Sequence, residues 1–479
     1  MTDELDKLFL RAQDAFSTPQ IAAHAREIAY GNLTCLGRHT VTGMLTASGH
    51  QFDDWTASYR LFSQQRVNIE KLNDVAISAT LEELPPEQMM IIANMDDTIT
   101  KKTGKKIPGT AWRRDPLGPP FHTNFIWGQR FLQISLALPD KEGPCQSRAI
   151  PVVFHHSPTV KKPARTATAE QVQTFKEHQK QAKLSQQGSQ QVHKLRDKLD
   201  QQGHAKRILC MGVDGSYTNS TVLKNLPDRV TLIGRVRKDC KLYEPAQPTK
   251  AQMKGRKKVY GERIPTPEQI RKSDQYEWQT VKAWGAGKQH EFNVKVVKGL
   301  KWRSAGEDHT LQLMVVKPLG YRPNKTSKIL YREPAYFICT DNDLNAQDLL
   351  QAYIWRWEIE VNIRDEKTLL GCGKAQVTNP NSAANIPAFV TALYAFLLLA
   401  NHKALKNENR DALLPRSKWY PAKKDDRFTT GDLINHLRVE LWVKGMGMNF
   451  SGFVKKEQTT KSRRNRANPL TSALFYSRC

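Results

Sequence analysis

Residues Tyr353–Lys367 read YIWRWEIEVNIRDEK, and the interpretation of the chain starts from this stretch. At about 100° per residue on one helix, four polar side chains fall within an arc of about 60°. They are Tyr353, Arg356, Glu360 and Lys367. A phenol, a guanidinium, a carboxylate and an ammonium on one face suit a metal ion bound beside a phosphate chain. The alternative is a solvated helix face with i,i+4 ion pairs such as Arg356–Glu360.

The charge of the chain favours a polyanionic partner. The 479 residues include 73 Lys and Arg against 47 Asp and Glu, which leaves a formal charge of +26. With 39% hydrophobic residues, this is the composition of a folded protein of several domains and not of a basic disordered tail. We therefore expect nucleic acid as the partner, with an anionic membrane surface as the second choice.

Nothing in the sequence predicts secretion or membrane insertion. The start, MTDELDKLFLRAQ, has no basic region followed by an apolar run, so we expect no signal peptide. The longest apolar run, residues 388–400, is too short to span a bilayer and predicts a buried helix. The seven cysteines are scattered without a CxxC pair, which argues against a disulfide framework or a zinc site. These features predict a cytoplasmic protein without membrane contact.

Residues 1–85 have a helical pattern. Thr18 and Pro19 predict a helix start, with the threonine as the cap. Residues 37–45, GRHTVTGML, resemble the turn and second helix of a helix-turn-helix motif. Arg38, His39, Thr40 and Thr42 would then lie where DNA-reading side chains are placed. An ordinary helical hairpin explains this segment equally well.

The next part of the chain predicts a mixed α/β core. The apolar run QMMIIANM from residue 88 predicts a buried strand that ends at Asp96-Asp97-Thr98. Two strand-like runs, one long helix at 169–202, a strand at 207–213 that ends at Asp214, a short helix and a fifth strand follow. Three strands followed by alternating helices and strands predict a mixed sheet covered on both faces.

The core pattern stops after residue 236 and returns at Ala335. Alternating runs between these positions predict a β-rich insertion. The predicted divisions are an N-terminal helical DNA-binding domain (1–85), the first part of the core (86–236), the insertion (237–334), the second part of the core (335–400) and a C-terminal region with a basic tail (401–479).

Three acidic residues are candidates for chemistry. Asp96 and Asp214 each follow a predicted strand, and Glu360 lies on the late helix. Three carboxylates around one point suit two hard divalent cations, which support in-line phosphoryl transfer. Taken singly, an Asp at a strand end is also a common turn former or helix cap. Asp97 competes with Asp96, and because neighbouring strand residues face opposite ways, only one of them should reach the metals.

These residues resemble the cut-and-paste transposases of bacterial insertion sequences, which have a ribonuclease-H-like DDE core. One branch has a late signature of Tyr, two residues, Arg, three residues, Glu, six residues and Lys, which Tyr353, Arg356, Glu360 and Lys367 match at every position. Asp96-Asp97-Thr98 is similar to the Asp-x-Thr motif of the family, which favours Asp96 over Asp97. The branch also has a β-rich insertion between its second and third acids.

The resemblance implies a fold, an activity and a cofactor. The fold would be α/β, with a ribonuclease-H-like mixed sheet interrupted by the insertion. The protein would bind the terminal inverted repeats of its element, cut double-stranded DNA and join the ends to target DNA with two Mg²⁺ ions, which Mn²⁺ can replace. Asp96, Asp214 and Glu360 would be the catalytic metal ligands, and Tyr353, Arg356 and Lys367 would hold DNA phosphates. A homodimer holding two DNA ends is expected.

Two readings of another kind stay open. The chain could be a decayed or domesticated transposase that binds DNA without cutting it, although its three acids are all present. It could also be another ribonuclease-H-like nuclease.

Several weaker candidates complete the sequence-based predictions. By family resemblance, a tryptophan of the insertion could stack on a flipped base, with packing residues as the alternative. The available ones are Trp278, Trp284 and Trp302. The basic loop after the first acid could follow a phosphate backbone or be merely solvated. Its lysines are Lys101, Lys102, Lys105 and Lys106. His155 and His156 have no partner at metal spacing and are interpreted as structural.

Overall fold

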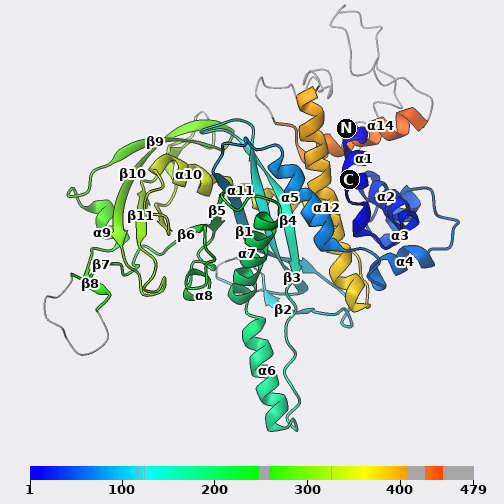
Figure 1. Cartoon of the computed structure of the whole chain (residues 1–479), viewed down its shortest axis with the longest axis horizontal. Helices are drawn as coiled ribbons and strands as arrows, with labels where there is room; N and C mark the ends of the chain where they lie inside the picture. Colours follow the sequence, from blue (N-terminus) through cyan, green and yellow to red (C-terminus); the bar gives the residue numbers. More distant parts are fainter. Residues whose placement is uncertain are drawn as a thin grey trace, which may run out of the picture.

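A computed structural model gives the arrangement of the chain (Figure 1). The structure describes residues 1–115, 118, 119, 121, 122, 124–247, 258–324, 326–407 and 427–445. The predicted basic tail, which follows residue 454, lies outside the described residues.

A ten-stranded mixed sheet forms the centre of the molecule. Its order is β2-β3-β1-β5-β6-β14-β11-β10-β9, and β4 pairs with β3. The strands are β1 (Met90–Lys101), β2 (Ala111–Arg114), β3 (Phe125–Pro139), β4 (Ser147–His156), β5 (Ile208–Val213), β6 (Val230–Arg235), β9 (Gln279–Gly285), β10 (Lys288–Leu300), β11 (Leu311–Val316) and β14 (Ala335–Cys339). β1, β5 and β6 are parallel, whereas β3 is antiparallel to β1 and β14 is antiparallel to β6. The predicted mixed α/β class is confirmed.

The strands predicted as an insertion extend this sheet. β11 pairs with β14, and β10 and β9 follow, so their buried faces continue the core (Figure 1). Two small hairpins lie off the sheet: β7 (Tyr243–Pro245) with β8 (Tyr260–Arg263), and β12 (Gly320–Tyr321) with β13 (Leu330–Tyr331). The division of the chain into domains stays a prediction.

Helices cover both faces of the sheet. They are α1 (Thr2–Arg11), α2 (Pro19–Thr34), α3 (Val41–Ala47), α4 (Thr56–Ser63), α5 (Ile69–Leu81), α6 (Ala169–Gln181), α7 (Leu184–Gln201), α8 (Ser220–Leu223), α9 (Pro267–Lys272), α10 (Ala346–Trp355), α11 (Trp357–Thr368), α12 (Pro380–Asn407) and α14 (Thr430–Gly445), with a short 3₁₀ turn at Gln13–Ala15. The face of β1 that carries Met95 packs against α7, where Gly188 lies close to the Met95 side chain. The opposite face packs against α10 and α11.

The helical character of residues 1–85 is confirmed. Thr18 caps α2 by accepting a hydrogen bond from the amide of Ile21, and Pro19 is the first helical residue, as predicted. These helices pack against α12 through Phe9 on Phe396 and Phe62 on Phe389, with ring centroids 5.6 and 5.4 Å apart. The predicted buried helix at 388–400 is the middle of α12. By length and composition α12 could cross a membrane, alone among the described helices, but most of it is buried inside the protein.

The prediction of one long helix over residues 169–202 is wrong in one respect, because this segment forms two helices, α6 and α7. Lys183 is extended between α6 and α7. At 100° per residue, Val172 and Phe175 would point about 180° away from Leu195 and Leu199 on a single helix. One straight helix could not bury both pairs against the same sheet, and only α7 has buried residues.

Candidate active site

The first acidic pair lies inside β1 and not at its end. The sequence predicted that the strand ends at Asp96-Asp97-Thr98, but β1 continues to Lys101 because β3 pairs with it as far as Gly128. β5 ends earlier, at Val213, which is in parallel register with Met95. Asp96 and Asp97 therefore lie just beyond the last residue of β5, where a neighbouring strand no longer covers that side of β1.

The register between β1 and β5 separates the two aspartates. Met95 pairs with Val213, so Asp96 and Asp214 are the next residues of two parallel neighbours. Residues in register on adjacent parallel strands face the same way, and successive residues alternate. Asp96 and Asp214 consequently share the α11 face of the sheet, whereas Asp97 faces the α7 side.

The partners of Asp97 agree with this placement. The Tyr217 hydroxyl, which is buried, donates to Asp97 Oδ1 at 3.1 Å. The Arg130 guanidinium lies 3.2 Å from Oδ2. Sequence reasoning missed both partners, since Arg130 appeared only as part of an apolar strand and nothing marked Tyr217 as a neighbour of β1.

The late helix brings the third acid to Asp96. The Arg356 guanidinium bridges two carboxylates, with nitrogen–oxygen distances of 3.1 Å to Asp96 and 2.8 Å to Glu360. Its side chain is only 13% exposed. The guanidinium also lies 5.7 Å from the Tyr353 ring centre. Three of the four residues of the predicted face therefore meet.

The single helix predicted for this stretch is wrong in detail. It breaks at Arg356, which ends α10 and precedes α11, although its backbone remains near helical values. Buried anchors hold the two parts in place. The Trp355 indole donates to the carbonyl of Cys145, just before β4, and the Asn362 side chain donates to the carbonyl of Ala149, near the start of β4. Asn345 caps α10 by accepting a hydrogen bond from the amide of Asp348 at 2.9 Å.

Burial raises the pKa of Asp96 to about 6. Arg356 acts in the opposite direction, and the charges of Asp214 and Asp97 add to the rise. Burial likewise raises the pKa of Asp97, against the opposing effect of Arg130. One oxygen of Asp214 accepts hydrogen bonds from the amide and hydroxyl of Ser216. Negative charge is thus concentrated at the edge of the sheet where β5 ends.

The donor set suits a hard divalent cation. Asp96, Asp214 and Glu360 offer carboxylate oxygens, the ligands that Mg²⁺ prefers. A cation, the Arg356 guanidinium, already lies between Asp96 and Glu360. Among the described residues, no three His, Cys, Asp or Glu side chains are close enough together to hold one metal ion. The residue types therefore fit the metal, while Arg356 takes up part of the binding capacity of two carboxylates.

Comparison with known proteins assigns the family. Residues 13–303, more than half of the chain, match the family of DDE superfamily endonucleases. The chain belongs to this family. No curated protein matches it. Membership in the DDE superfamily endonucleases supports a nuclease or transposase type of activity on DNA and agrees with the ribonuclease-H-like sheet. The matched region contains Asp96 and Asp214, while Glu360 lies beyond it.

Tyr353 and Lys367, the other two residues of this DDE endonuclease predicted to bind DNA, lie in different surroundings. Tyr353 is half-buried against Phe337, with ring centroids 4.1 Å apart, and burial raises its pKa. Lys367 lies two turns beyond Glu360 and is half-buried, so that its pKa is lowered. It forms no ion pair within the described part of the chain. The assignment of these residues to DNA binding stays a prediction.

Lys102 does not fit the predicted basic loop. Its side chain is buried and donates to the carbonyls of Gly373 and Ala375 at 2.6 and 2.7 Å. It therefore joins β1 to the loop after α11 and cannot follow a phosphate backbone. Lys101, Lys105 and Lys106 are exposed, and the Lys105 ammonium lies 4.6 Å from the ring centres of both Trp112 and Trp127.

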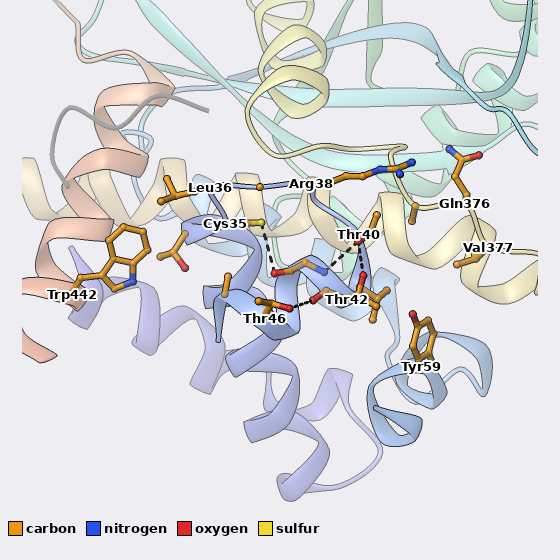
Figure 2. A pocket seen from close by; sticks show the side chains of 16 residues that line it. Cys35, Leu36, Arg38, Thr40, Thr42, Thr46, Tyr59, Gln376, Val377 and Trp442 are labelled. Atoms are coloured by element: carbon orange, nitrogen blue, oxygen red, sulfur yellow. Dashed lines mark hydrogen bonds between the residues drawn. The ribbon is translucent and has the colours of Figure 1, made fainter. Parts of the chain in front are cut away.

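The predicted helix-turn-helix segment is partly buried. His39 is 2% exposed and packs beside Gly371, so it cannot contact DNA in this arrangement, and burial lowers its pKa to about 4. Thr40 caps α3, and its hydroxyl lies 2.9 Å from that of Thr42. Arg38 is exposed at the rim of a cavity of about 770 Å³, which is bounded by α2–α4, residues 375–377 and Trp442 (Figure 2). DNA binding by this region stays a prediction.

The tryptophans of the predicted insertion are half-buried. Trp278 lies under the Lys295 ammonium, 4.4 Å from its ring centre. The backbone amide of Trp284 donates to the Gln351 side chain, and that side chain donates back to the Trp284 carbonyl. Trp302 borders a cavity of about 910 Å³ that also contains Gly215 and Arg235 and therefore adjoins the second acid. His155 and His156 are half-buried, and His156 stacks on Phe131, which agrees with a structural role.

Proposed function

We propose that this DDE endonuclease is the transposase of an insertion sequence. It would bind the terminal inverted repeats of its element, cut the DNA and transfer the ends to a target. The observation that carries the proposal is the position of Asp96 and Asp214 just after the last paired residues of β1 and β5, together with the Arg356 guanidinium that joins Asp96 to Glu360 of α11. The matching spacing of Tyr353, Arg356, Glu360 and Lys367 supports the Tyr-Arg-Glu-Lys branch.

In this proposal the three carboxylates hold two Mg²⁺ ions, which Mn²⁺ can replace. When bound, such ions supply Lewis-acid stabilisation of phosphate oxygens and activate a water or a 3′-hydroxyl. Asp96 must be ionised to act as a metal ligand. Burial raises its pKa and so opposes ionisation, whereas a positive charge nearby, such as the Arg356 guanidinium, favours the ionised form.

Arg356 would orient the DNA phosphate at the cut. A guanidinium has five N–H donors and pairs well with phosphate. Its contacts with Asp96 and Glu360 use part of this capacity, and its buried Nε has no hydrogen-bond partner among the described residues. Tyr353 and Lys367 would border the same phosphate chain. Double-stranded DNA, both element ends and target, is the proposed partner of a cytoplasmic homodimer.

The test is a cleavage assay on a labelled duplex that carries the ends flanking the gene. Wild type, Glu360→Gln and Glu358→Gln would be compared with Mg²⁺ and with EDTA. Glu358 is the matched control, because it lies on the same helix but pairs with Arg427 at 2.7 Å. We expect Mg²⁺-dependent cutting at the ends by wild type and Glu358→Gln, and end binding without cutting by Glu360→Gln.

Other results would favour the other readings. Cutting that does not depend on the repeats would indicate a general ribonuclease-H-like nuclease. Bound but uncut DNA with folded wild-type protein would indicate a non-catalytic DNA-binding protein. If Glu360→Gln cut at the wild-type rate, the assignment of the third ligand would be wrong.

A further inference from the structure

An arm formed by residues 157–183 projects from the body of the molecule (Figure 1). It consists of a strap, residues 157–168, then α6 and a short connection to α7. No residue of α6 is buried. Val172 and Phe175, its two large apolar residues, are only half-buried.

The arm leaves the sheet at the edge that carries the acids. β3 is antiparallel to both β1 and β4, so β4 runs in the same direction as β1. His156, the end of β4, therefore lies at the edge where β5 ends before Asp214. Arg113 of β2 fixes the base of the arm by donating to the Thr159 hydroxyl at 2.7 Å and to the carbonyl of Ser157.

The arm is more basic than the rest of the chain. It has six Lys and Arg against two Glu. The six are Lys161, Lys162, Arg165, Lys176, Lys180 and Lys183, all of them exposed. None of them forms an ion pair with another described residue, whereas Arg130 and Arg356 beside the acids are paired. On α6, Lys176 and Lys180 are four residues apart and so lie on one face.

Stability of the fold does not account for α6. A helix of this length is marginal in water without tertiary packing. The capping box of Thr168 and Gln171 fixes its first turn, but the helix buries no side chain of its own. Within α6 two Lys balance two Glu, so the excess positive charge of the arm comes from Lys161, Lys162, Arg165 and Lys183 on either side of the helix. An exposed basic arm beside an acidic catalytic edge is what a protein needs to hold a polyanion next to its active site.

We propose that this arm binds the sugar–phosphate backbone of duplex DNA next to the point of cleavage. The inference rests on the proposed function, because it takes DNA as the substrate. At 1.5 Å per residue, the 13 residues of α6 span about 20 Å, or about six base pairs. A second copy of the chain fits the arm less well, because the centres of protein interfaces are apolar and α6 is mostly Gln, Lys and Glu.

The test compares two double variants of the full-length protein. Lys176→Gln/Lys180→Gln removes two charges from α6 and keeps good helix formers. Lys141→Gln/Lys206→Gln is the matched control, because these exposed lysines lie at the opposite edge of the sheet, before β4 and before β5. Binding of a 40-base-pair duplex would be measured between 50 and 200 mM KCl in EDTA, which prevents cutting.

We expect the arm variant, and not the control, to show a weaker salt dependence. Each phosphate contact contributes about 0.9 to the slope of log K against log salt, so losing two lowers the slope by about 1.8. Over this fourfold range of salt, wild type should lose about tenfold more affinity than the arm variant. Equal slopes for wild type and the arm variant would overturn the proposal.

The remaining outcomes are distinguishable. If the arm variant shifts the oligomeric state in analytical ultracentrifugation and keeps the wild-type slope, the arm is an interface between copies and our proposal is wrong. If wild type binds no DNA, both this proposal and the proposed function fail. If the slopes differ as expected but wild type never cuts the element ends, the proposed transposase activity fails, whereas DNA binding by the arm stands.

Discussion

Replacing Asp96 and Asp97 separately tests the orientation of β1, which determines the site. Asp96 faces Arg356 and shares its side of the sheet with Asp214, whereas Asp97 faces Tyr217 and Arg130. We predict that Asp96→Ala abolishes cleavage with a small effect on stability. Asp97→Ala should instead destabilise the fold and leave cleavage by the folded protein within about tenfold of wild type.

The magnitudes follow from the contacts. Asp97→Ala leaves the buried Tyr217 hydroxyl and Arg130 without their partner, which costs about 1–3 kcal/mol of unfolding free energy. Asp96→Ala leaves Arg356 paired with Glu360, so less stability should be lost. The loss of a metal ligand removes several kcal/mol of transition-state stabilisation, and about 4 kcal/mol corresponds to about a thousandfold in rate.

Urea unfolding of both variants and of Tyr217→Phe, with cleavage assays at a temperature where each is folded, would measure these effects. Tyr217→Phe should cost less in the Asp97→Ala background than in wild type, with a coupling energy of about 1 kcal/mol. If Asp97→Ala were folded and inactive while Asp96→Ala still cut, the orientation that we assign to these residues would be refuted.

Three further predictions concern pH and packing. Since the pKa of Asp96 is about 6, Mn²⁺ affinity measured by electron paramagnetic resonance should fall about tenfold per pH unit below this value, and no change between pH 5 and 7 would contradict the assignment. Burial lowers the pKa of Lys102 to about 8, so the unfolded state binds more protons than the folded state between about pH 8 and 10.4. The unfolding free energy of wild type relative to Lys102→Met should therefore rise by up to about 3 kcal/mol across this window. A difference that does not change with pH would contradict the burial of this lysine. Gly373→Ala should lower the unfolding free energy by about 2 kcal/mol or more, because φ is +90° and the added Cβ would lie 2.5 Å from Thr100 Cβ; unchanged thermal unfolding would count against this packing.

Local sequence patterns determined the elements of this fold. The apolar run before Asp96 predicted β1, the apolar segment 388–400 predicted a buried helix, and Thr18-Pro19 predicted the start of α2. These predictions succeeded because a strand, a helix or a cap depends mainly on residues within a few positions of one another. The spacing of the late acid and its arginine likewise anticipated their ion pair.

Contacts between distant segments determined the rest. The β1–β5 register, between segments more than 100 residues apart, decides that Asp96 and not Asp97 shares a face with Asp214. The burial of Lys102 and His39 depends on the loop after α11, about 270 and 330 residues further along the chain. No local period predicts such pairings, because strand register and burial are set by the partner segment. The sequence by itself therefore named the acids and the elements that carry them, and the tertiary structure decided which side chains meet.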